Sequence, residues 1–259
     1  MNISCSLYEK RETYLSELKT LLRKYALLII TGCLFGIQFL FNEYALTTLS
    51  PMDIGFGRVG IGFFTLLVLF PLFLKQEKKR QKKREFAKIH WYNYAILGFF
   101  EGTLPCLVLP WGQLHVDSAI AAILISTMPF FAIIFAAIMR LPGEQLSLHK
   151  IASIVIGFIG VIFIVHPTTL ENIWREISPE LLVLLASASW GLGLALIRKF
   201  PPIHPIRLCR NFLFWAAIEM AIIWVIFGHP LEIRFTVLSF WSLVILGSIN
   251  AGVVYIFYI

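Results

Sequence analysis

Hydrophobic and polar positions alternate along this chain in long blocks rather than residue by residue. A helix of about 20 residues, rising 1.5 Å per residue, crosses the ~30 Å hydrocarbon core of a bilayer. The apolar stretches of about that length are residues 25–46, 54–74, 92–114, 118–139, 148–165, 181–197, 208–227 and 237–259. The pattern therefore predicts about eight transmembrane helices joined by short polar connections.

The apolar stretches are predicted to be helices even though they contain many β-branched and aromatic residues. In lipid every backbone polar group must be hydrogen-bonded within the segment or a closed barrel, and barrel strands show an alternation over ~10 residues that is not visible here. The whole chain is 58% hydrophobic and 14% charged, with a mean hydropathy of +0.80, which excludes a water-soluble domain. The predicted fold class is an all-α polytopic membrane protein.

The positive charges fall mainly on one side of the predicted membrane. Lys and Arg number five in residues 1–24, eight in 75–88, two in 140–150 and four in 198–210, which is 19 of the 22 in the chain. Because basic loops stay in the cytoplasm, the N-terminus is predicted to be cytoplasmic and the protein to lie in the cell membrane, in bacteria the inner membrane. Topology thus accounts for the net charge of +7 without a nucleic-acid partner.

The basic run at residues 75–88 follows the second apolar stretch directly. Such a run either binds anionic lipid head groups or acts only as a solvated anchor beside the span, and the sequence leaves both readings open. Residues 1–24 mix basic and acidic groups without an apolar core or a small-residue cleavage site, so they are not predicted to be a signal peptide.

Catalytic and metal-binding patterns are missing from the sequence. The six histidines lie near the ends of apolar stretches and far apart, and no H-E-x-x-H, G-x-S-x-G or glycine-rich phosphate loop occurs. The four cysteines are scattered, without a C-x-x-C pair. We therefore expect neither an enzyme nor a protein with a metal or organic cofactor.

Polar groups inside the apolar stretches are the candidate solute or ion path, because such groups usually face a cavity. Glu101 lies a third to halfway along its stretch, beside Gly98, Gly102 and Pro105, which loosen a helix and expose carbonyl groups. A buried carboxyl group at this point suits a proton relay. The further candidates are Asn42, Glu43 and Glu219. That these groups only join helices together is the alternative.

Two parts of the chain carry similar landmarks. Gly36, Arg58 and Gly98 are 22 and 40 residues apart, and Gly191, Arg210 and Gly247 are 19 and 37 residues apart. Five stretches separate each landmark from its counterpart, and an odd number means that the two copies enter the membrane from opposite sides. The spacing therefore indicates an inverted repeat, as in many transporters, unless the two apolar regions agree by chance.

Several residues resemble the EamA-type permeases of the drug/metabolite transporter superfamily. The similar stretches are LSPMDIGFGRVGIGFFTLLVLFPLF and SAIAAILISTMPFFAIIFAAIMRLPGEQLSLHKIASIVIGFIGVIFIV, and the similar positions are Pro51, Arg58, Pro129, Gly143, Glu144, Gly157 and Gly160. The resemblance implies ten helices in two inverted five-helix repeats, cytoplasmic termini, and transport of amino acids, nucleotide-type metabolites or drugs. Structural roles are expected for Arg58, pairing with Asp53 or capping its loop, and for Glu144, holding a turn.

Against that family pattern the chain divides into a cytoplasmic tail, 1–24, a first repeat, 25–166, and a three-helix second repeat, 167–259. The ninth and tenth helices are missing from this division. We interpret the chain as a truncated permease for a small solute. The alternative is a membrane assembly subunit completed by a partner chain or, as a homodimer, by a second copy. Gly157 and Gly160 could then let a neighbouring helix approach closely.

Overall fold

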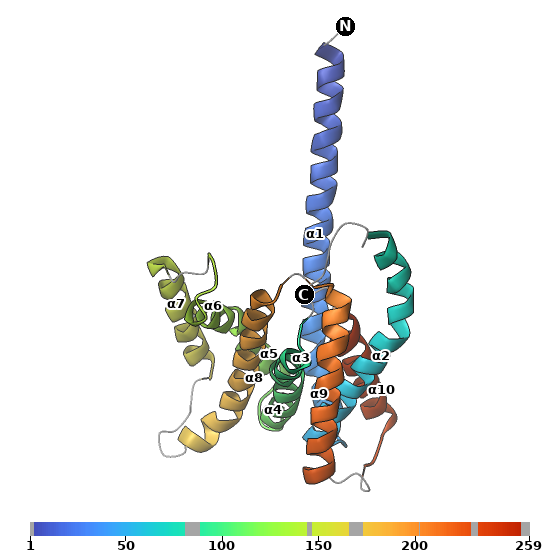
Figure 1. Ribbon diagram of the computed structural model, residues 1–259. Coiled ribbons are helices and arrows are strands. Elements are labelled where there is room, and N and C mark those ends of the chain that lie inside the picture. The colour runs from blue at the N-terminus through green and yellow to red at the C-terminus, as the bar shows by residue number, and fades with distance from the viewer. Residues whose placement is uncertain are drawn as a thin grey trace.

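The computed structural model describes residues 3–80, 89–143, 147–165, 173–201, 203–228 and 233–254, and every regular element among them is a helix (Figure 1). The elements are α1 (Ile3–Leu46), α2 (Pro51–Arg80), α3 (Trp91–Gly98), η2 (Phe99–Thr103), α4 (Leu104–Gln113), α5 (Ser118–Ile125), α6 (Met128–Ile138), α7 (Leu148–Val165), α8 (Ile173–Lys199), α9 (Pro205–Phe227), α10 (Val237–Ile245) and η3 (Leu246–Val253). The segments η2 and η3 are π-helical. This confirms the predicted all-α fold class.

Each of the eight apolar stretches corresponds to a helical segment. Six segments are long and apolar enough to cross a membrane: Tyr25–Leu46, Pro51–Pro71, Trp91–Gln113, Ser118–Ile138, Ile177–Lys199 and Pro205–Phe227. Leu148–Val161 and Val237–Val253 are shorter apolar helices. The chain is thus a multi-pass membrane protein.

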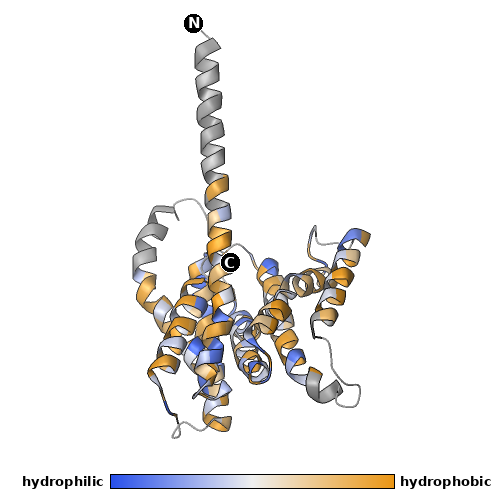
Figure 2. Ribbon diagram, turned by 180° about the vertical axis from the view of Figure 1, so that it is seen from behind, coloured by the Kyte–Doolittle hydropathy of each residue, from blue (hydrophilic) through white to orange (hydrophobic). Residues whose placement is uncertain are grey.

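Polar and apolar side chains are distributed as a bilayer requires. Apolar side chains at the periphery are exposed, as for Leu28 (67%), Val225 (67%) and Trp241 (58%), whereas Arg58 and Glu101 are fully buried. Figure 2 shows hydrophobic residues along most of the length of the described helices, with hydrophilic residues among them. In water this arrangement would be unfavourable, but in lipid the exposed residues meet hydrocarbon and the polar groups are sheltered between helices.

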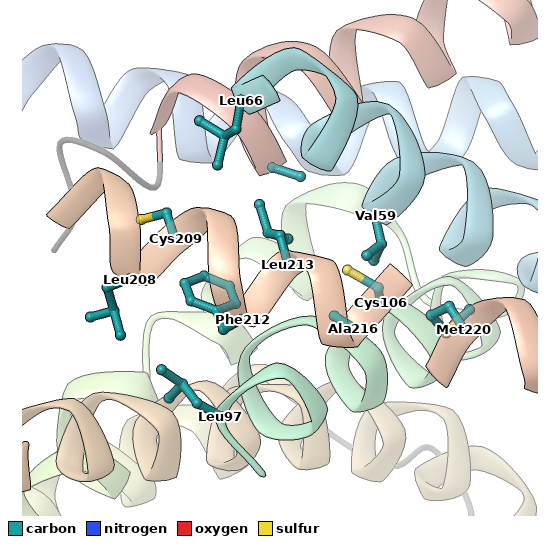
Figure 3. Close-up of a cluster of buried hydrophobic side chains, with 11 residues drawn as sticks. Val59, Leu66, Leu97, Cys106, Leu208, Cys209, Phe212, Leu213, Ala216 and Met220 are labelled. Atoms are coloured by element: carbon teal, nitrogen blue, oxygen red, sulfur yellow. The ribbon is translucent and has the colours of Figure 1, made fainter. Parts of the chain in front are cut away.

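The helices α2 and α9 pack against each other. Each also packs against a helix of the other half of the chain, α2 on η3 and α9 on α3 and η2. Figure 3 shows the cluster between them, where Phe212 and Leu213 of α9 meet Val59 of α2, Leu97 of α3 and Cys106 of α4. In a bilayer such contacts stabilise through close van der Waals packing, because lipid tails are as apolar as these side chains.

Glycines lie at two close crossings of these helices. A Cβ added at Gly98 would lie 2.6 Å from the carbonyl oxygen of Phe212, and one added at Gly247 would meet Ile61 and lie 3.2 Å from the carbonyl oxygen of Arg58. Gly98 therefore lets the third segment approach α9, and Gly247 lets the eighth segment approach α2. Larger residues at either position would push the backbones apart.

The fourth apolar stretch is divided into α5 and α6. Between them the hydroxyl of Ser126 donates to the carbonyl of Ile123, and that of Thr127 donates to Leu124, each over 2.6 Å. These bonds offer the backbone carbonyls a local partner, and Pro129 then starts a new helix at a first-turn position.

The peripheral helix α7 and the connection that precedes it contain the remaining family-like positions. A Cβ at Gly157 would collide with the ring of Phe130 on α6, whereas Gly160 has nothing within 4 Å among the described residues. Gly143 turns the chain with a φ of +80°, a conformation that favours glycine. Glu144 lies outside the described residues, as do residues 81–88 of the basic run.

Candidate functional site

Glu101 lies in the π-helical segment η2, inside the third membrane segment, and is fully buried (0% exposed). A π-helical turn contains one residue more than an α-turn and is often found at functional positions. Gly102 in the same segment allows close packing, since a Cβ there would lie 2.6 Å from the Cβ of Ala216. The segment thus holds a carboxyl group between helices instead of toward lipid.

Residues of α8 surround Glu101. Trp190 donates from its indole N–H to the carbonyl of Glu101 over 2.9 Å, and Ser189 donates to the carbonyl of Phe100 over 2.7 Å. Next to them, a Cβ at Gly193 would collide with the carboxyl group of Glu101. The π-helical segment therefore has its carbonyls bonded to α8, and Gly193 leaves room for the carboxyl group.

A second buried polar group connects α1 with the end of α4. Asn42 donates to the side-chain oxygen of Gln113 over 2.7 Å, and Gln113 donates to the carbonyl of Phe39 over 3.1 Å. The side-chain oxygen of Asn42 has no hydrogen-bond partner among the described residues. Because Gln38 and Asn42 are four residues apart on α1, both amides lie on one face of that helix.

Arg58 of α2 connects the two groups. It is 1% exposed, donates from Nη2 to the side-chain oxygen of Gln38 over 2.5 Å, and lies with its guanidinium carbon 5.9 Å from the ring centre of Trp190. A buried charge held by a neutral amide and an aromatic ring is only partly compensated. The four helices α1, α2, α4 and α8 and the segment η2 thus enclose a polar cluster, defined here as Gln38, Asn42, Arg58, Glu101, Gln113 and Trp190.

The pairing of Arg58 with Asp53 that the sequence suggested is not what the structure shows. Asp53 instead accepts hydrogen bonds from the indole of Trp224, over 2.8 Å, and from Ser50. Residues five apart on an α-helix point about 140° away from each other, so Arg58 and Asp53 cannot share one helix face. The expected pairing of these two residues is therefore wrong.

Comparison with known proteins identifies the kind of molecule that carries this cluster. A family model described as the EamA-like transporter family matches residues 22–166. The chain belongs to this family. The uncharacterized transporter YoaV of Bacillus subtilis is 27% identical over 214 residues, which are 81% of this chain and 72% of that protein. An uncharacterized transporter of Archaeoglobus fulgidus is 27% identical over 199 residues, 77% of this chain and 66% of that protein. No solved structure matches the chain.

The other candidate residues of this EamA-like transporter lie outside the polar cluster. Glu43 is exposed and accepts a hydrogen bond from the hydroxyl of Ser118. Glu219 is partly buried on α9 and accepts from the hydroxyl of Thr103 over 2.6 Å. Both contacts join neighbouring helices, which is the structural reading that the sequence left open.

Sequence reasoning missed Gln38 and Gln113. The two glutamines are amides inside or at the end of apolar stretches, which is the same signal that singled out Asn42. A further missed residue is Asn250 in η3, which is 2% exposed and donates to the carbonyl of Leu34 over 2.6 Å. It follows Gly247 by three residues, as Glu101 follows Gly98.

Proposed function

We propose that this EamA-like transporter is a permease that moves a small metabolite, such as an amino acid, a nucleotide-type metabolite or a drug, through the polar cluster. Its transport is coupled to protons through Glu101. The observation that carries this proposal is the full burial of an acid, a base and three amides between helices of a membrane protein. Such groups are costly in hydrocarbon unless they face a polar path.

The test of transport is an untargeted comparison of cells that express the chain with cells that carry an empty vector. Mass spectrometry of medium and cytosol should reveal at least one small solute whose distribution changes about tenfold. The same solute should then move in proteoliposomes that contain the purified chain. Unchanged distributions together with inactive proteoliposomes would contradict the transporter role.

We also propose that residues 25–166 and 167–259 are copies of one inverted repeat. Three observations support it. Both third helices contain a π-helical segment at the paired glycines Gly98 and Gly247, and each of these glycines packs on the second helix of the other copy. In addition, α8 packs on α4 as α1 packs on α10. A solute path between the copies follows from this arrangement.

The proposed topology predicts the accessibility of single cysteines in an otherwise cysteine-free chain. Cysteines at positions 77–88 should react with a membrane-impermeant maleimide only after the cells are permeabilised, because this basic segment is cytoplasmic. A cysteine in place of the exposed Arg234, between α9 and α10, is the matched control and should react in intact cells. The opposite pattern would reverse the orientation.

A second candidate function, a membrane assembly subunit completed by another chain, is favoured by one asymmetry. Gly191 of α8 packs closely on α6, with a Cβ there 2.8 Å from the backbone nitrogen of Ala132. Its counterpart Gly36 of α1 has nothing within 4 Å among the described residues, and the neighbouring Ile37 is 44% exposed. Crosslinking from a cysteine at position 37 to a protein other than this chain, in cells where purified chain alone is inactive, would support this second function.

A further inference from the structure

The guanidinium of Arg58 has more donor positions than the cluster uses. Only Nη2 is bonded, to Gln38, while Nε and Nη1 have no hydrogen-bond partner among the described residues. The side-chain oxygen of Gln38 accepts the bond from Arg58, so the amide nitrogen Nε2 of Gln38 does not face the guanidinium. This nitrogen also has no hydrogen-bond partner among the described residues. Three buried nitrogens from α1 and α2, namely Nε and Nη1 of Arg58 and Nε2 of Gln38, therefore have no acceptor among the described residues.

This arrangement is costly unless something else binds there. Buried polar groups are almost always hydrogen-bonded, and buried charges are paired. Trp190 lies against the guanidinium at 5.9 Å, and its own N–H is bonded to Glu101, which fixes the ring in place. The unpartnered nitrogens of the planar guanidinium, Nε and Nη1, lie on different edges of the group, and each can donate a charge-assisted hydrogen bond to an anionic group.

We propose that Arg58, with the amide nitrogen of Gln38, binds the anionic group of the transported solute. The solute is thus one that carries a carboxylate or a phosphate. This inference rests on the proposed transport function and adds the chemical class of the solute to it. Asn42 contributes an acceptor oxygen on the same face of α1, available to a donor group elsewhere on the solute.

Arg210 provides a matched control. It holds the corresponding landmark position in the second repeat, but two of its nitrogens donate to Asn211 over 2.8 and 3.1 Å, and it lies over Phe70 at 4.4 Å. Its position is also less buried than that of Arg58. Arg210→Gln therefore removes an equal charge from the membrane protein without touching the cluster.

The experiment measures binding by the purified chain in nanodiscs as ligand-induced thermal stabilisation. The probes are matched pairs: succinate and succinamide, N-acetylphenylalanine and its amide, adenosine monophosphate and adenosine. An anionic probe should raise Tm in the wild type and in Arg210→Gln, while its neutral partner should not. Arg58→Gln should weaken that binding by about 100-fold, and Arg58→Lys, which keeps the charge but loses the planar set of donors, by about tenfold.

Equal stabilisation by neutral probes, retained binding in Arg58→Gln, or no stabilisation by any anionic probe would overturn the inference. Arg58→Lys keeps the test meaningful if Arg58→Gln fails to fold, because it should still prefer anionic probes. The two proposals fail separately. Transport of a neutral solute would overturn the anion site and leave the permease proposal standing. Anion binding without transport in proteoliposomes would support the anion site and contradict the permease proposal.

Discussion

Glu101→Gln is expected to lower transport by at least about 100-fold, the loss typical when a group that transfers a proton is removed. Glutamine has nearly the same size, so the packing against Gly193 and the hydrogen bonds from Trp190 and Ser189 to the backbone should be kept. What is lost is the charge and the exchangeable proton. The measurement is the initial rate of transport in proteoliposomes with and without a pH gradient. The solute is the one whose distribution changes in cells that express the chain.

Glu219→Gln is the control for this change. Its carboxyl group is also in a membrane segment, but it is only partly buried and accepts a hydrogen bond from Thr103, a contact that an amide oxygen can keep. We expect a rate within about twofold of the wild type, as for a surface substitution worth a few tenths of a kcal/mol. Unchanged transport in Glu101→Gln would remove this residue from the proton path while leaving the transporter assignment intact.

Gly191→Val should lower the stability of the protein and Gly36→Val should not, although both place valine on an apolar helix. At Gly191 the new Cβ would lie 2.6 Å from the Cβ of Phe131 and 3.0 Å from the carbonyl oxygen of Met128, so α6 and α8 must separate. Overpacking of this kind typically costs about 1–3 kcal/mol. Thermal denaturation of the purified chain should therefore show a lower Tm and a smaller folded fraction.

At Gly36 the same substitution meets open space among the described residues and should leave Tm unchanged. The comparison is made on the purified chain and repeated on solubilised membranes, where any natural partner is still present. A lower Tm of Gly36→Val in the solubilised membranes alone would show that another helix covers this face of α1. That result would support the function as an assembly subunit. Equal losses in the purified proteins would contradict the packing described for α1.

The sequence predicted the positions of the helices well and the residues that pack between them poorly. Length and hydropathy located all eight apolar segments because a bilayer imposes a minimum helix length that few soluble sequences imitate. The same reasoning found Glu101 and Asn42, since polar groups are rare in such segments. The placement of Arg58 was missed because it lies near the start of α2, where a sequence reading expects a loop contact.

What surrounds Arg58 depends on contacts between residues far apart in the chain. Gln38 lies on α1 and Trp190 on α8, and no local pattern joins either of them to α2. Helical spacing alone would still have excluded the pairing of Arg58 with Asp53 and placed Gln38 beside Asn42. The distinction is physical: periodicity reports which side chains share a face, whereas tertiary packing decides what that face meets.

The two π-helical segments also give their helices a means of rotation. Because a π-turn contains one extra residue, its conversion to an α-turn shifts the register and swings every later side chain by about 100° around the helix axis, without breaking the chain. In η2 this swivel lies at Glu101, and in η3 it lies between Gly247 and Asn250. For the proton coupling proposed above, a turn of half a helix would be enough to present Glu101 to alternate sides of the membrane, without the movement of a whole helix.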